Sequence, residues 1–142
     1  MYKHKDIIIV SIIILLLIIY TYIKLKPTYC EIDPVLEKLR LDLIKVEPRV
    51  INLNFFSHDE SFTEDKQRVF ICLKDPITNE YYDNNTILSV GLHEIAHAFS
   101  SVIDKEHVTP EFNNLHNHYR QKAAELKLFD PEFQVSPTYC KK

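Results

Sequence analysis

The sequence predicts an α+β fold, in which a short mixed sheet packs on a histidine-bearing helix and on the helix that follows it, after an N-terminal transmembrane helix. Three observations predict it. Residues 7–23 form an unbroken apolar run, segments rich in β-branched and aromatic residues lie mid-chain, and apolar residues recur at helical spacing on either side of them. A chain of 142 residues has room for one small domain besides the apolar run.

The apolar run at residues 7–23 contains no charged residue and is at the short end of what spans a bilayer. Lysines flank it on both sides, and Tyr20 and Tyr22 suit an interfacial position. A cleaved signal peptide would need a small-residue cleavage site, which is missing here. We therefore predict a single-pass membrane anchor over residues 1–26 and a domain over residues 27–142. The flanking charges slightly favour a domain outside the cytosol.

The amino-acid composition limits which partners and which disulfides this protein can have. A net charge of −3 gives no strong sign of nucleic-acid binding, and nothing in the composition indicates the oligomeric state. The three cysteines allow one disulfide and one free thiol. Cys30 and Cys140, near the two ends of the predicted domain, could pair in an oxidising compartment or could both remain free.

The first predicted helix of the domain begins at Asp33-Pro34, a capping residue followed by proline at the first helical position, and ends before Pro48. Two strands are predicted next, at residues 50–56 and 68–74, with a polar loop between them and a short third strand at Tyr81-Tyr82. Apolar residues repeat along the first helix at spacings of three and four: Ile32, Leu36, Leu39, Leu43 and Val46.

The predicted helix from about Thr86 to Val102 carries His93, Glu94 and His97. Histidines four residues apart lie on one helical face, so both rings can reach one metal ion, and the intervening glutamate can reach a water beside it. Zinc hydrolysis uses neutral imidazoles as ligands and a carboxylate as general base. Zn²⁺ is therefore the expected cofactor, although a five-residue pattern of this kind also arises by chance.

A catalytic zinc site needs a third protein ligand. His107 is our first choice, because it lies in the loop that leaves the motif helix and can turn back to the same metal. Asp104, Glu111 and His116 are the alternatives. The next helix opens at Thr109-Pro110, and its apolar stripe consists of Phe112, Leu115, Tyr119, Ala123 and Leu126.

The motif region resembles zincins of the WLM and SprT-like group. The resemblance lies in the segment Ile87 to His97, in the pattern His107-x-x-x-x-Phe112, and in the ending Pro137 to Cys140, which is similar to small metallopeptidase-like proteins of large DNA viruses. It covers about residues 50–140 and implies a minimal zincin-like fold. It also implies that His93, His97 and His107 are zinc ligands and that Glu94 is the base. The predicted anchor and the acidic balance depart from the group and weaken the expectation of a DNA-repair substrate.

The sequence thus favours a membrane-anchored zinc metallopeptidase that acts on a protein or peptide substrate. The strand at residues 68–74 is expected to border its cleft, where an extended substrate could add as a further strand. Tyr119 and His116 are possible stabilisers of the oxyanion. The alternatives are an inactive zincin-fold module that binds zinc or a partner at a membrane, and a helical membrane adaptor without metal.

Overall fold

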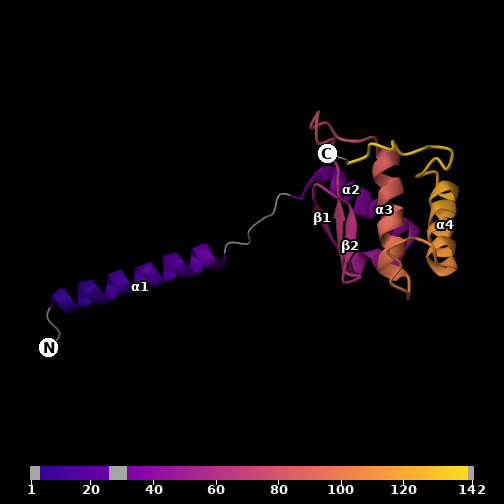
Figure 1. The fold of residues 1–142 in the computed structure, drawn as a ribbon. Coiled ribbons are helices and arrows are strands. Elements are labelled where there is room, and N and C mark those ends of the chain that lie inside the picture. Colours follow the sequence, from indigo (N-terminus) through magenta and orange to yellow (C-terminus); the bar gives the residue numbers. More distant parts are fainter. Residues whose placement is uncertain (1–3, 26–31, 141–142) are drawn as a thin grey trace. The chain divides into compact units, whose positions relative to one another are not determined.

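The computed structural model describes the backbone of residues 4–25 and 32–140. The chain divides into two units, residues 1–31 and residues 32–142. The first unit contains one helix, α1 (His4–Leu25), and the second contains all the other elements (Figure 1). Within the described residues the fold is α+β, as the sequence predicts, and it contains four α-helices and a three-stranded sheet.

The transmembrane part of the prediction is contradicted. Among the helices that the structure describes, none combines the length and the apolar character needed to cross a bilayer. This finding contradicts both the predicted transmembrane helix and the predicted single-pass membrane localisation.

The second unit begins with α2 (Pro34–Val46), whose start and end are those predicted. Asp33 Oδ1 accepts hydrogen bonds from the backbone N–H groups of Val35 and Leu36, which satisfies two donors that a helix start leaves free. Pro48 does end the helix, but it also opens a 3₁₀-helix, η1 (Pro48–Asn52). The strand predicted from residue 50 therefore starts later, at Asn54.

The sheet has the strand order β1-β3-β2 and is mixed, as predicted. The central strand β3 (Arg68–Ile71) pairs in parallel with β1 (Asn54–Ser57) and antiparallel with β2 (Phe62–Glu64). Strand β2 lies inside the stretch predicted to be a polar loop. The predicted third strand at Tyr81-Tyr82 is reduced to a single bridge between Tyr81 and Lys74.

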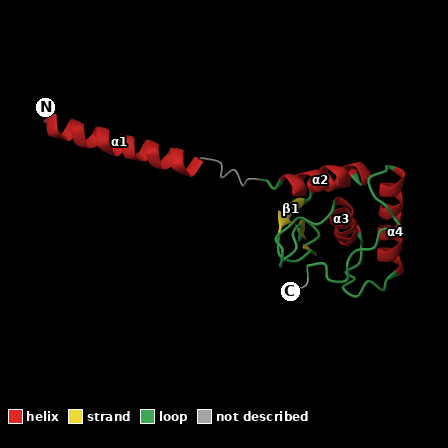
Figure 2. Cartoon of the chain, turned by 90° about the horizontal axis from the view of Figure 1, so that it is seen from above, coloured by secondary structure: helices red, strands yellow, loops and turns green. Residues whose placement is uncertain are grey.

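Helix α3 (Asn84–Phe99) is the centre of the second unit, with the sheet on one side, α4 (Pro110–Glu125) on the other and α2 across them (Figure 2). Its apolar residues join those of α2, β3 and α4 in the core, which includes Leu43, Ile71 and Phe112. A Cβ on Gly91 would lie 2.9 Å from Leu39 Cδ1. The single glycine of the chain therefore allows α2 and α3 to approach closely, and packing explains its place inside a helix.

Candidate metal centre and cleft

Helix α3 carries three of the four proposed site residues, His93, Glu94 and His97. Asp83 caps the helix, since its Oδ1 accepts from the backbone N–H of Thr86 at 2.9 Å. From this start the helical period places His93 and His97 on the same face, with ring centroids 4.8 Å apart. The opposite side of the helix is fixed in the core by residues such as Leu92 and Ile95, so the helix has little freedom to turn the histidines away.

His107 reaches the same point from the loop between α3 and α4. Asp104 organises this loop: its carboxylate accepts from the backbone N–H groups of Val108 and Thr109 at 3.2 and 2.7 Å, and from the Thr109 hydroxyl at 2.6 Å. These bonds hold the pKa of Asp104 at about 2, below its usual range, with the Thr109 hydroxyl as the main cause. His107 has a left-handed backbone (φ 58°), and its carbonyl accepts from Asn113 Nδ2 at 3.1 Å. The turn that directs the ring is thus fixed on both sides.

The three Nε2 atoms converge. They are separated by 3.2 Å between His93 and His107, 3.2 Å between His93 and His97, and 2.9 Å between His97 and His107. Hydrogen bonds alone do not satisfy such a triangle, because a hydrogen on one Nε2 can point at only one of the other two. Nitrogens that bind one tetrahedral zinc ion at 2.0–2.1 Å are about 3.3 Å apart. The triangle therefore has nearly the size that a zinc ion requires.

Two of the three histidines, His93 and His97, are in the ionisation state that metal ligands need. Burial is the main cause that lowers the pKa of His93 to about 3, and the neighbouring histidines lower it further. Burial likewise lowers the pKa of His97, and His107 adds to the effect. These two rings are therefore neutral at pH 7 and offer a lone pair without first losing a proton.

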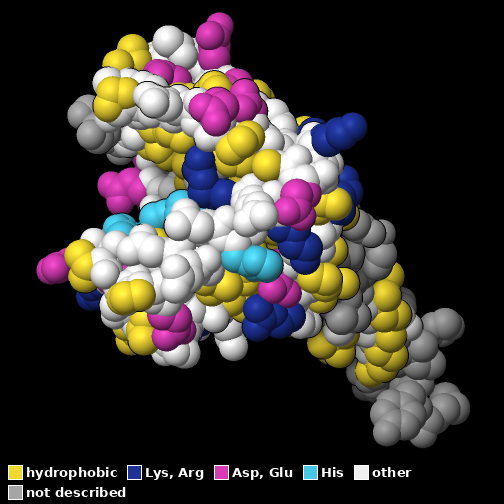
Figure 3. All heavy atoms as spheres, turned by 90° about the vertical axis from the view of Figure 1, so that its right-hand side faces the viewer, with side chains coloured by type: hydrophobic (Ala, Val, Ile, Leu, Met, Phe, Trp, Pro, Cys, Tyr) yellow, Lys and Arg dark blue, Asp and Glu magenta, His cyan; other side chains and the backbone are white. Residues whose placement is uncertain are grey.

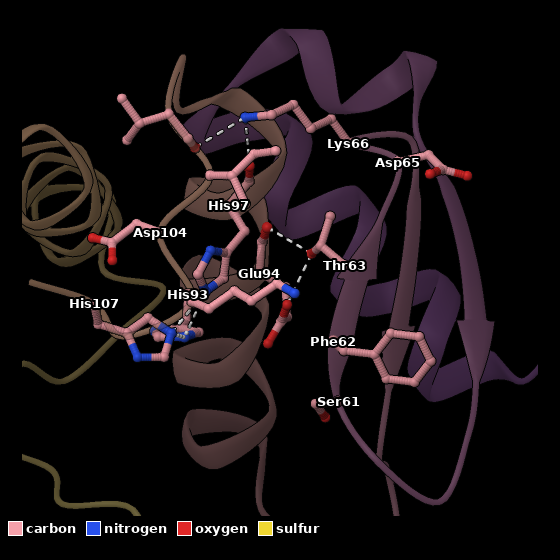
Figure 4. A pocket seen from close by; sticks show the side chains of 13 residues that line it. Ser61, Phe62, Thr63, Asp65, Lys66, His93, Glu94, His97, Asp104 and His107 are labelled. Carbon is pink, nitrogen blue, oxygen red and sulfur yellow. Dashed lines mark hydrogen bonds between the residues drawn. The ribbon is translucent and has the colours of Figure 1, made fainter. Parts of the chain in front are cut away.

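Glu94 lies beside the histidines with its carboxylate turned to β2. The Thr63 hydroxyl is 2.8 Å from Glu94 Oε2 and 2.9 Å from the Glu94 carbonyl oxygen (Figure 4). Glu94 is only 5% exposed. Burial raises the pKa of its carboxyl to about 7, and the bond from Thr63 opposes this rise. A carboxyl with a pKa near neutrality can both accept and return a proton.

A cleft of about 670 Å³ opens over this group. Its base contains His93, Glu94 and His97; β2 and the following turn form one wall, and the loop that carries His107 forms the other. Histidine side chains reach the surface on the face that α4 occupies (Figure 3). His107 is exposed and the other two histidines are half-buried, so the converging nitrogens are accessible from solvent.

Lys66 stabilises the wall of the cleft. From the turn after β2, its Nζ donates to the carbonyl oxygens of Ser100 and Val102, just past the end of α3, the second at 3.2 Å. A cation at the C-terminus of a helix interacts favourably with the helix dipole. The ammonium thus ties the β2–β3 turn to the end of the helix that carries the histidines.

The other residues considered as the third ligand, Asp104, Glu111 and His116, do not point their ligand atoms at the point where the three histidine nitrogens converge. Asp104 is occupied by the loop backbone, and Glu111 Oε1 accepts from the Ser101 backbone N–H at 2.7 Å. The ring of His116 lies 5.2 Å from that of His93, and among the described side chains its Nε2 is buried without a hydrogen-bond partner. His116 therefore borders His93 but does not join the group of three converging nitrogens.

Two expectations about the cleft are corrected. The strand predicted to border it, at residues 68–74, is the covered centre of the sheet, and β2 borders the cleft instead. Tyr119, considered as an oxyanion stabiliser, bonds through its hydroxyl to Glu47 Oε2 at 3.1 Å and does not line the cleft. Thr63 was missed because its strand is only three residues long within a polar stretch.

No protein-family profile and no solved structure matches the chain, so the zincin-like part of the predicted fold has no structural relative in its support. The chain is similar to two uncharacterized proteins of invertebrate iridescent viruses. It is 34% identical over 83 residues to protein 136R of Invertebrate iridescent virus 6, covering 57% of this chain and 45% of the relative. It is 30% identical over 89 residues to protein 042R of Invertebrate iridescent virus 3, covering 63% and 54%. The chain thus spans about half the length of these curated relatives.

Proposed function

We propose that this chain is a zinc-dependent metallopeptidase in which His93, His97 and His107 bind the metal and Glu94 is the general base. The observation that carries the proposal is the convergence of three Nε2 atoms within 3.2 Å of one another, beside a buried carboxylate. A bound zinc ion would supply a Lewis acid that polarises a peptide carbonyl and acidifies a water. The resemblance of the motif region to WLM and SprT-like peptidases supports the same reaction class.

The protein's own groups supply the proton transfers. Glu94 accepts a proton from the attacking water and returns it to the amine that leaves. Thr63 donates to Oε2 of that carboxylate at 2.8 Å, which leaves the other carboxylate oxygen for the water. Burial of Glu94 keeps bulk water from competing for the proton.

An extended peptide fits the edge of β2. The residues of this wall that line the cleft include the consecutive Ser61, Phe62 and Thr63. Side chains of consecutive strand residues point to opposite faces, so it is the edge of the strand that borders the cleft. On its other side β2 pairs with β3. We infer that the substrate adds to this edge through main-chain hydrogen bonds, which suits a peptide of varied sequence.

The test is the Glu94→Gln variant, assayed with a fluorogenic peptide library and by zinc analysis. We expect zinc-dependent cleavage by the wild type and a loss of about 10²–10⁴-fold in kcat for the variant, the contribution typical of a general base. Zinc content should not change, because Glu94 is not a ligand. Glu106→Gln, an exposed carboxylate in the loop after α3, is the matched control and should remain active. Full activity of Glu94→Gln, or zinc-loaded wild type that cleaves no peptide, would contradict the proposal.

A further inference from the structure

The C-terminal tail is fastened to the end of the sheet that borders the cleft. A disulfide joins Cys140 to Cys72, the residue that follows β3. The backbone N–H of Cys140 donates to Tyr82 Oη at 3.0 Å, and the rings of Tyr82 and Tyr139 lie 4.8 Å apart. A disulfide between Cys140 and Cys30 is the pairing considered from the sequence. In the structure Cys140 is paired with Cys72 instead, and Cys30 lies outside the described residues. The last five described residues form no helix or strand, and the disulfide is their covalent attachment to the sheet.

Beside the disulfide, three residues form a closed ring of hydrogen bonds. Tyr139 Oη donates to the carbonyl of Cys72 at 2.5 Å, and the backbone N–H of Cys72 donates to Ser61 Oγ at 2.8 Å. Ser61 Oγ lies 3.0 Å from Tyr139 Oη. Because the Tyr139 hydrogen is used at Cys72, the Ser61 hydroxyl is the donor in this last contact. Each of the three donors thus has one acceptor, and the ring depends on Tyr139 being held in place.

Ser61 connects this ring to the candidate active site. It directly precedes β2, and Cys72 directly follows β3, so their bond continues the pairing of the two strands beyond Phe62 and Phe70. Thr63, two residues further along β2, holds the carboxylate of Glu94. The tail therefore fixes the start of the strand whose middle residue positions Glu94.

We propose that the Cys72–Cys140 disulfide is a redox-sensitive latch that controls the position of β2 and thereby the activity of the cleft. In the oxidised form Tyr139 holds Ser61, and β2 keeps Thr63 against Glu94. Two molecules of a small thiol open the latch: the S–S bond breaks, each cysteine sulfur gains one electron and one proton, and the two thiols leave joined as their own disulfide. The regulatory part of this inference rests on the proposed peptidase function.

The experiment compares three forms of the full chain in a Cys30→Ser background, so that no third thiol can exchange with the pair. The forms are the oxidised protein, the protein reduced with a phosphine, which avoids thiols that compete for zinc, and the Cys140→Ser variant. Hydrogen exchange of residues 61–64, zinc content and peptide hydrolysis are measured on each. We expect exchange at residues 61–64 to be about tenfold faster in the reduced and Cys140→Ser forms, the factor that one lost hydrogen bond corresponds to. Zinc content should stay unchanged while kcat falls.

Two further variants separate the latch from a general loosening of the tail. Tyr139→Phe keeps the disulfide but lacks the hydroxyl, and should accelerate exchange at residues 61–64 in the oxidised form. Gln134→Ala, an exposed change in the same tail, should have no effect. Equal exchange in the oxidised and reduced forms, or equal kcat in two forms that both cleave peptide, overturns the latch. Faster exchange on reduction in a protein that cleaves no peptide in either form supports the latch and overturns the proposed function.

Discussion

Replacing Asp104 with alanine should weaken zinc binding although Asp104 is not placed among the converging ligands. Its carboxylate accepts three hydrogen bonds, two from backbone N–H groups and one from the Thr109 hydroxyl, and these bonds shape the loop that presents His107. Without them His107 has to be ordered by the metal itself, including its left-handed backbone (φ 58°). Partners that orient a ligand typically account for about 10–100-fold in metal affinity, and we expect a loss in this range.

Two substitutions of Asp104 that remove different numbers of hydrogen-bond acceptors should weaken zinc binding to different degrees. Oδ2 of Asp104 accepts both bonds from Thr109, and Oδ1 accepts the bond from Val108. Asp104→Asn keeps one carbonyl oxygen and should therefore lose less affinity than Asp104→Ala. Competition with a chromophoric chelator measures the affinity, and circular dichroism of the metal-free proteins checks the fold. Glu106→Ala, an exposed acid in the same loop, should bind zinc like the wild type. If Asp104→Ala binds as tightly as Glu106→Ala, the loop does not depend on Asp104 and the reasoning fails.

Two other predictions concern hydrogen bonds away from the metal. Thr63→Val should lower kcat by about tenfold with unchanged zinc affinity, because the carboxylate of Glu94 loses its donor; steady-state kinetics of the zinc-loaded protein that equal the wild type would contradict this. The Arg49 guanidinium, aided by smaller contacts, lowers the pKa of Glu47 from 4.5 to about 2. Since the native pKa lies below the unfolded value, this stabilisation is complete above pH 4.5 and is lost as the pH falls towards 2. The difference in free energy of unfolding between wild type and Glu47→Gln should shrink across that range in urea titrations, and a constant difference would disprove the assignment.

The helices of the second unit could be predicted from local signals in the sequence, namely capping residues and apolar stripes. Asp33 and Thr109 are the caps that the sequence indicates, and both accept a bond from the following backbone. These signals are local, since a cap and an apolar stripe depend on residues within one or two turns. His107 was the first choice because it lies in the loop between two consecutive helices, and in the structure this loop turns back and brings its ring to His93 and His97.

Features that depend on contacts between distant segments could not be anticipated. Strand β2 has only three residues, and it forms because β3 offers an antiparallel edge beside α3, which no local pattern reveals. The partner of Cys140 depends on where the tail lies in space, so spacing alone could not distinguish Cys72 from Cys30. The N-terminal helix forms over the predicted apolar run, but the prediction that it spans a membrane is contradicted, because no helix among the described residues meets the length and apolarity needed.

Zinc analysis of the purified full chain tests the central claim most directly. The wild type and His58→Ala, a histidine outside the converging group, should each retain stoichiometric zinc after dialysis, whereas His107→Ala should lose it. This result is expected because two histidines four residues apart, without a third ligand, do not complete a tetrahedral protein site. A wild type without zinc, or His107→Ala with as much zinc as His58→Ala, would contradict the three-histidine centre on which the proposed function is built.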